Sequence, residues 1–259
     1  MSGNFFTDLW KYRELLLLFS LNEVKLRYRN SVLGFFWAFL EPLLMLGILY
    51  FVFTNIFVNT TENFAIFLLL GLIVWYMVSR GTTLGLSSIS DKVGLLQKTP
   101  IRKEIVVISA CLASLIMTAF EFSAFVFFAV IFNFVPPITI LLLPLIIITI
   151  FIISIGLSFI LSALYTSFKD LKIIWQITLQ AGFFASPIFY SLDRFPEDIQ
   201  MFFYLNPMVP ILNSVRAVAL YGNLPNTVDL VYLLVFTIVI LVTGYMIFKI
   251  KSRTMLEKL

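Results

Sequence analysis

Three cations, Lys25, Arg27 and Arg29, lie within five positions, just before an apolar run that begins at Val32. Guanidinium and ammonium groups bind phosphate oxygens, and basic clusters beside a membrane span bind anionic lipid head groups. The same cations can serve topology alone, because positive residues favour the cytoplasmic side of a membrane. The sequence leaves both interpretations open: a topological signal, or a site for an anionic head group such as the pyrophosphate of a lipid-linked substrate.

Two carboxylates lie inside the apolar segments that follow. Glu41, next to Pro42, is about nine residues into the first segment, roughly 14 Å along a helix, and Glu121 is some 24 Å along the third. Carboxylates inside a membrane are costly and usually face a bundle interior or a water-filled path. For Glu41, lining a polar path and a structural bond to another helix remain equal alternatives. For Glu121 the structural bond is favoured.

Further polar and aromatic side chains could line such a path. Gln176 and Gln180 are four residues apart and share one helix face,. They could bond neighbouring helices together or line a hydrophilic path. Aromatic residues beside polar positions could offer flat faces to a passing sugar chain, or could simply pack against lipid. These candidates are Phe36, Trp37, Trp75, Tyr76, Phe184 and Tyr190.

Composition indicates an integral membrane protein. The 259 residues are 61% hydrophobic and 12% charged, about half the roughly 25% charge of a soluble domain. Histidine is absent and Cys111 is the single cysteine, so neither a metal site nor a disulfide within the chain is expected. No phosphate-binding GxxxxGK[ST] loop occurs,. We therefore expect no ATPase activity, cofactor or nucleic-acid partner on this chain itself.

Six segments have the roughly 20 apolar residues that a membrane-crossing helix needs, which predicts an all-α membrane fold with six transmembrane helices. The segments are Val32–Phe53, Phe64–Leu84, Ile105–Phe134, Thr139–Ala163, Leu171–Tyr190 and Leu230–Phe248. Most Lys and Arg residues fall on the side of both termini, which are therefore expected in the cytoplasm. Arg194 and Arg216 lie opposite, and Arg80 is placed near a span end.

Residues 201–220 are apolar enough for a seventh span, but a seventh span would break the charge asymmetry. Asn206, Pro207 and Pro210 also interrupt the backbone hydrogen bonding of a helix. The preferred interpretation is a re-entrant hairpin of two short helices between spans five and six. Its first helix would start at Pro196 and its second would end at Gly222.

Two segments outside the spans have helical patterns. Residues 5–19 form an amphipathic pattern, predicting a helix that lies flat at the cytoplasmic interface; packing on the bundle is the alternative. Residues 87–104 predict a short helix with Ser90 as N-cap and an apolar patch among charges. That helix could dock a soluble partner or lie on the membrane.

Several motifs resemble the membrane subunits of ATP-binding-cassette polysaccharide exporters, which carry O-antigen, capsule or teichoic-acid chains. The first is RYRNSVLGFFWAFLEPLL at residues 27–44. The others are QKTPIRKEI (97–105), FKDLKIIWQI (168–177), SPIFYS (186–191) and YLNPMVPILNSVRAVAL (204–220). The sequence departs from the family pattern at Lys169, where Arg is usual, and at Glu41, where Gln is common.

The resemblance implies one type-2 export permease domain over residues 1–259. It comprises an interface segment (1–30), spans one to five (32–190), a periplasmic gate hairpin (191–227), span six (230–248) and a cytoplasmic tail (249–259). The implied assembly is a homodimer in the inner membrane with two separate ATPase subunits that bind ATP and Mg, exporting a lipid-linked glycan. A drug or small-molecule exporter of the same superfamily, or a secondary transporter, is the alternative.

The resemblance also assigns roles to residues. The ATPase-coupling residues would be Asp91, Lys92, Val93, Leu95 and Leu96. The gate residues would be Pro196, Asn206, Pro207, Pro210 and Arg216.

Overall fold

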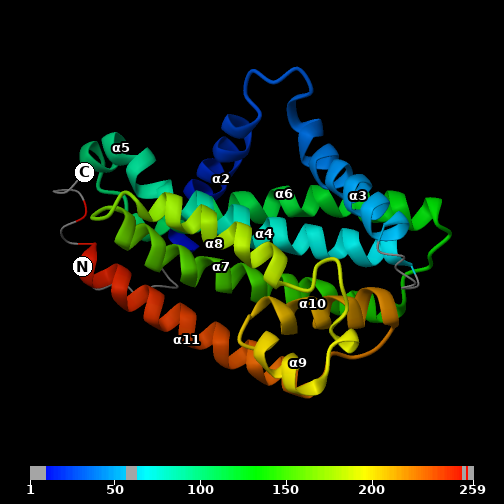
Figure 1. Cartoon of the computed structure of the whole chain (residues 1–259). Helices are drawn as coiled ribbons and strands as arrows, with labels where there is room; N and C mark the ends of the chain where they lie inside the picture. Colours follow the sequence, from blue (N-terminus) through cyan, green and yellow to red (C-terminus); the bar gives the residue numbers. More distant parts are fainter. Residues whose placement is uncertain (1–9, 57–62, 253–254, 256–259) are drawn as a thin grey trace.

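The computed structural model describes residues 10–56, 63–252 and 255, and these contain helices and connecting turns without a strand (Figure 1). The helices are α2 (Arg13–Arg27), α3 (Trp37–Asn55), α4 (Phe64–Asp91), α5 (Val93–Lys98), α6 (Lys103–Ile131), α7 (Leu143–Tyr165), α8 (Leu171–Ala185), α9 (Glu197–Phe203), α10 (Met208–Arg216) and α11 (Thr227–Lys251). Short 3-10 turns precede α3 and α7, and a π-helical turn, Ala217–Tyr221, follows α10.

The central helix is α4, which packs against α6 and α7 and also contacts α3, α8 and α10. Its residues Phe64–Trp75 are all buried, because an almost uninterrupted apolar sequence can meet neighbours on every side,. On the far side of α7, α11 packs closely where Gly156 meets Gly244. A Cβ on Gly156 would lie 2.8 Å from the Ile240 carbonyl carbon, so only glycine permits this approach,.

Within the part of the chain that the structure describes, five helices are long and apolar enough to cross a membrane: Gly34–Asn55, Phe64–Asp91, Lys103–Ile131, Ile138–Tyr165 and Thr227–Lys251. The predicted fifth span, Leu171–Tyr190, is helical only to Ala185, and α8 is therefore about 22 Å long,. Its end has a local cause, since Pro187 disfavours helical geometry at Ser186, which is extended with φ −97° and ψ 143°,.

The segment between α8 and α11 folds as two short helices, as predicted. The first, α9, begins directly after Pro196, and Gly222, with a left-handed φ of 73°, ends the π-helical turn that continues the second, α10,. Pro210 falls in the first turn of α10, where proline is tolerated,. Asn206 fixes the bend between them: its Oδ1 accepts from the Met208 amide at 3.0 Å, and its Nδ2 donates to Ser186 Oγ at 2.9 Å.

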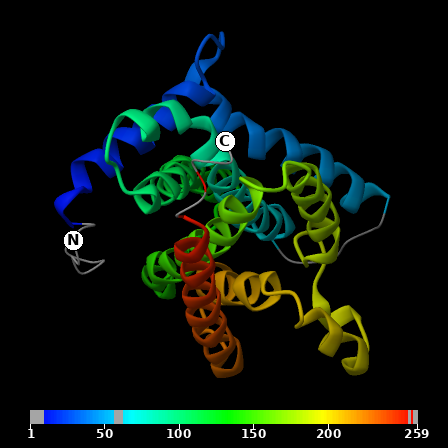
Figure 2. The ribbon, with the colours of Figure 1, turned by 90° about the vertical axis from the view of Figure 1, so that its left-hand side faces the viewer.

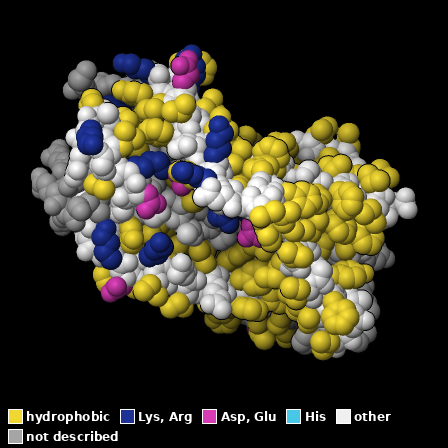
Figure 3. Space-filling view, turned by 90° about the horizontal axis from the view of Figure 1, so that it is seen from above, with side chains coloured by type: hydrophobic (Ala, Val, Ile, Leu, Met, Phe, Trp, Pro, Cys, Tyr) yellow, Lys and Arg dark blue, Asp and Glu magenta, His cyan; other side chains and the backbone are white. Residues whose placement is uncertain are grey.

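One end of the bundle collects the charged connections. Lys92 Nζ lies 2.6 Å from Glu23 Oε2, which ties the end of α4 to α2, and Lys103 Nζ donates to the Ser252 carbonyl after α11. In Figure 3 the Lys and Arg side chains gather at this end, whereas the opposite half is mainly hydrophobic. The start of α6 and the end of α11 therefore lie on the same side of the molecule.

The helices α2 and α3 cross one side of the bundle, and α11 lies on the opposite side (Figure 2). Ser20 on α2 donates to the Ser109 carbonyl of α6 at 3.0 Å, and Val24 packs beside Met117. The other face exposes Leu17 and Leu18. The N-terminal helix thus packs on the bundle, which was the alternative interpretation, while keeping an apolar face outward; residues 5–9 of the predicted helix lie outside the described part.

Candidate functional site

Four alternating charges form a continuous chain across four helices. Arg27 ends α2, and its Nη2 lies 3.6 Å from Oε2 of Glu41 on α3. The same carboxylate oxygen lies 3.9 Å from Nη2 of Arg80 on α4, which in turn donates to Oε1 of Glu121 on α6. Each cation therefore has an acidic neighbour from another helix.

The chain of charges runs from a buried pair to a partly exposed pair. The Arg80 and Glu121 side chains are 3% and 0% exposed, whereas those of Arg27 and Glu41 are 36% and 37% exposed. Buried charges are tolerated when paired. Glu121 bonds to a neighbouring helix, as favoured from the sequence. We infer that the buried pair is structural, while the outer pair can still meet water or a ligand.

The helix that carries Arg80 is longer than the predicted span, because α4 continues past Leu84 to Asp91, eleven residues beyond Arg80. That continuation is less apolar, but its hydroxyls bond back into the helix: Thr82 Oγ1 donates to the Val78 carbonyl at 2.8 Å and Thr83 Oγ1 to the Ser79 carbonyl at 2.6 Å. For the same reason Ser90 belongs to the last turn of α4, and the N-cap of α5 is Lys92 instead.

The start of the first membrane-crossing helix explains how Glu41 meets Arg27. Asn30 and Gly34 have left-handed φ values of 62° and 52°, which interrupt the chain between α2 and α3,. The α-helix therefore begins at Trp37, and Glu41 is its fifth residue, or the eighth of the membrane-crossing helix Gly34–Asn55, where the sequence placed it about nine residues in. This short distance brings the carboxylate beside Arg27.

Two cavities flank the Arg27–Glu41 pair. One, of about 580 Å³, is lined by Arg27, Tyr28, Ser31, Trp37, Glu41 and Leu44. The other, of about 260 Å³, is lined by Arg27, Glu41, Tyr76, Ser79, Arg80, Thr83 and Leu84. Burial raises the pKa of Tyr28, so its phenol stays a neutral donor. The structure thus brings together Arg27, Trp37, Glu41 and Tyr76, whereas Lys25 and Arg29 are exposed outside these cavities.

The other predicted path residues are distributed over α8 and its neighbours. Gln176, Gln180 and Phe184 are exposed on α8, none of whose residues is buried. Trp75 is buried against Phe183 and Gly182, and Phe36 is exposed before α3. Tyr190 is half-buried and its hydroxyl donates to the Phe184 carbonyl at 3.2 Å. The glutamines therefore face away from the single chain.

The predicted coupling residues surround α5. Asp91 and Leu95 are exposed, Val93 is partly exposed, and Lys92 pairs with Glu23. Leu96 is only 6% exposed and packs in a cluster with Ile89, Val106 and Phe159. Leu95 is therefore the apolar side chain of α5 that is open to a partner, and Leu96 holds the helix onto the bundle.

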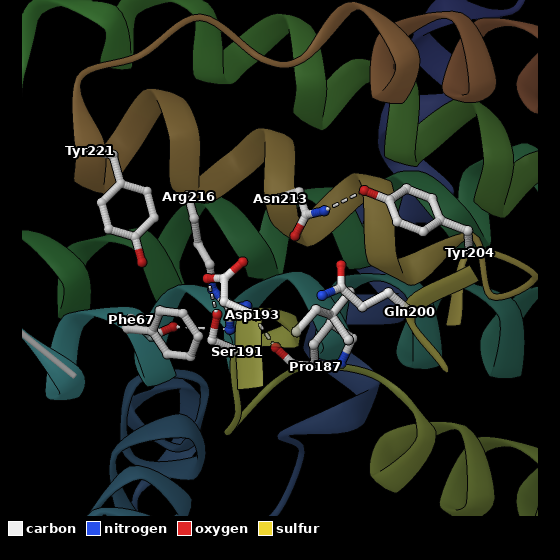
Figure 4. Close-up of a pocket in the computed structure, with 10 residues that line it drawn as sticks. Phe67, Pro187, Ser191, Asp193, Gln200, Tyr204, Asn213, Arg216 and Tyr221 are labelled. Carbon is white, nitrogen blue, oxygen red and sulfur yellow. Dashed lines mark hydrogen bonds between the residues drawn. The ribbon is translucent and has the colours of Figure 1, made fainter. Parts of the chain in front are cut away.

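Arg216 holds the break after α8, a role that the sequence did not reveal. It is 4% exposed, and its guanidinium donates to the carbonyls of Pro187 at 2.6 Å and Ile188 at 2.8 Å, and lies 3.4 Å above the Phe67 ring (Figure 4). These carbonyls lack helical partners because the chain is extended there. The sequence offered one signal for this contact: an arginine inside an apolar segment, together with the helix-breaking Ser186-Pro187 pair earlier in the chain. Gly71 leaves room for the Arg216 guanidinium, since a Cβ at position 71 would lie 3.1 Å from Arg216 Nη2.

Within the described ranges, no group of three or more His, Cys, Asp or Glu residues could hold a metal ion. Cys111 is free and buried.

Comparison with known proteins gives a consistent result. The family model described as ABC-2 type transporter matches residues 14–220. The "O-antigen export system permease protein RfbA" of Myxococcus xanthus is 28% identical over 97% of this chain and 98% of its own length, and that of Klebsiella pneumoniae is 30% identical over 93% of each. The "Polysialic acid transport protein KpsM" of Escherichia coli is 27% identical over 91% of this chain and 93% of its own. The chain is therefore a multi-pass membrane protein that belongs to the ABC-2 type transporter family.

Proposed function

We propose that this chain is the channel-forming permease subunit of an exporter that moves a lipid-linked polysaccharide across the bacterial inner membrane. The observation that carries the proposal is similarity along nearly the whole chain to permeases named for O-antigen export and polysialic acid transport. The charge distribution supports an orientation with both termini in the cytoplasm. ATP and Mg would be bound by separate ATPase subunits rather than by this chain.

The two cavities around Arg27 and Glu41, together called the Arg27 site, would receive the anionic head of the lipid carrier. Arg27 lies between two cavities and is only partly neutralised by Glu41, while the exposed Lys25 and Arg29 add positive potential nearby. Guanidinium groups bind phosphate oxygens with strong, charge-assisted hydrogen bonds. Trp37 and Tyr76 line the same cavities and would offer apolar and aromatic surface to the lipid or to the first sugar.

A homodimer would complete the conduit. The helix α8 buries none of its residues in the single chain and exposes Gln176 and Gln180, although polar groups facing lipid are costly,. A second copy facing α3 and α8 would enclose these amides beside a hydrated path. In this arrangement α8, extended by residues 186–190, would be the fifth of six crossings, α11 would be the sixth, and α9–α10 would form the re-entrant gate between them.

The coupling step gives the sharpest test. The proposal predicts that the chain co-purifies with its ATPase and that Leu95→Asp lowers the ATPase activity stimulated by the membrane subunit, since Leu95 is 38% exposed on α5. Leu224→Asp is the matched control, because Leu224 is 72% exposed on the connection before α11. Equal activity of the Leu95 variant and the parent, with both complexes intact, would contradict docking at α5.

A further inference from the structure

Another polar cavity lies in the hairpin between α8 and α11, away from the two cavities beside Arg27. Its volume is about 260 Å³, and it is bounded by the α8–α9 connection, α9, α10 and the buried face of α4 (Figure 4). That is below the roughly 300–1,000 Å³ typical of sites for drug-sized ligands. The space therefore suits one small ring rather than an extended chain.

The walls of this cavity alternate hydrogen-bond donors and acceptors. Asp193 supplies a carboxylate and accepts from Ser191 Oγ at 2.7 Å, which orients it. Gln200 and Asn213 supply amides, each able both to donate and to accept,. The Asn213 amide donates to the Tyr204 hydroxyl at 3.4 Å, so this side of the cavity is linked to α9.

The charged and aromatic residues that line this cavity indicate which class of ligand it can bind. The cavity has one cation, Arg216, and one carboxylate, Asp193, among its described lining, so it has no net preference for an anion. Arg216 already donates to the carbonyls of Pro187 and Ile188. Tyr204, Tyr221 and Phe67 add ring faces and hydroxyls,. Mixed hydrogen bonding beside aromatic rings is the complement of a neutral ring that carries several hydroxyl groups.

We propose that this hairpin cavity binds a single neutral sugar ring. The inference rests on the proposed function, because a glycan leaving the conduit would bring sugar units past the hairpin. The site is distinct from the Arg27 site in chemistry, since it recognises hydroxyl groups instead of a phosphate. The cavity also adjoins the break after α8, because Arg216 lines the cavity and donates to the carbonyls of the break. A π-helical turn, a feature frequent at functional sites, begins at the next residue,.

Saturation-transfer NMR on the purified full chain in lipid nanodiscs tests the proposal. Nanodiscs are needed because sugar-based detergents would compete. The probes are the methyl glycosides of glucose, galactose, mannose and rhamnose, with methyl glucuronide as the anionic comparison. We expect saturation transfer to at least one neutral glycoside, with an affinity that falls about ten-fold or more in Asp193→Ala, since hydrogen bonds to charged groups contribute most. Tyr221→Ala should weaken binding as well.

Matched controls are Asp198→Ala and Phe202→Ala, whose side chains are exposed on α9 outside the cavity lining. Both should bind the sugar like the parent. All four altered side chains are exposed, which favours normal folding. Absence of transfer to every neutral glycoside, equal loss in variants and controls, or tighter binding of the glucuronide would overturn the proposal. This binding assay needs neither ATP nor transport, so it is independent of the proposed export function. A chain that binds the sugar but exports no glycan would contradict the proposed function and leave the sugar site standing.

Discussion

Neutralising Glu121 should destabilise the bundle strongly, because it leaves the Arg80 guanidinium in a buried site. Glu121→Gln keeps the size and shape of the side chain but removes the charge that Arg80 Nη2 contacts. The two side chains are 0% and 3% exposed, so solvent cannot replace the lost partner. Breaking a buried ion pair costs about 3–5 kcal/mol, and the remaining contact with Glu41 at 3.9 Å favours the lower end.

A loss of about 3 kcal/mol corresponds to a Tm decrease of about 6–12 °C for a chain of this size. The single cysteine, Cys111, is 1% exposed, so a thiol-reactive dye on the purified protein reports unfolding directly. The double variant Arg80→Gln with Glu121→Gln should recover most of the stability, because no unpaired charge remains. Glu14→Gln is the control, since the Glu14 side chain is 89% exposed. A Glu121→Gln protein that melts with the parent, or a double variant worse than the sum of the two single variants, would refute this reasoning.

Three further predictions concern the Arg27 site and the close contact between α7 and α11. Glu41→Gln should raise the affinity for a pyrophosphate-headed lipid, because it frees Arg27 from its partly exposed ion pair. Such a pair contributes under about 1 kcal/mol, so the gain should be no more than about five-fold. Lipid competition on the purified protein measures the affinity, and weaker binding by the variant would contradict the prediction. Arg27→Ala with Arg29→Ala should lower export of a lipid-pyrophosphate glycan at an unchanged membrane level, whereas Arg13→Ala, at the far end of α2, should export normally. Gly156→Ala should cost about 1–3 kcal/mol by overpacking α7 against α11, whereas Gly94→Ala, with nothing within 4 Å, should melt like the parent.

Local signals in the sequence predicted local features well. The end of the π-helical turn at Gly222 and the start of α9 after Pro196 follow from the backbone preferences of glycine and proline themselves. Apolar length likewise located the five long helices. Where hydropathy falls but hydroxyls bond back into the helix, as at Thr82 and Thr83, the sequence underestimated the length of α4.

Contacts between distant residues were not predictable in the same way. Arg80 and Glu121 are 41 positions apart, and only the packing of α4 on α6 brings them together. The hairpin cavity similarly needs Phe67, Asp193 and Tyr221 from three separate segments. The position of Glu41 depended on two left-handed residues, Asn30 and Gly34, whose conformation sets where α3 begins.

The most direct test of the central claim is translocation in proteoliposomes that contain this chain, its ATPase subunit and a lipid-linked polysaccharide. The account predicts that the glycan becomes accessible on the far side of the membrane only when the ATPase and hydrolysable ATP are both present. Translocation at the same rate by this chain alone, without a nucleotide-hydrolysing subunit, would contradict it.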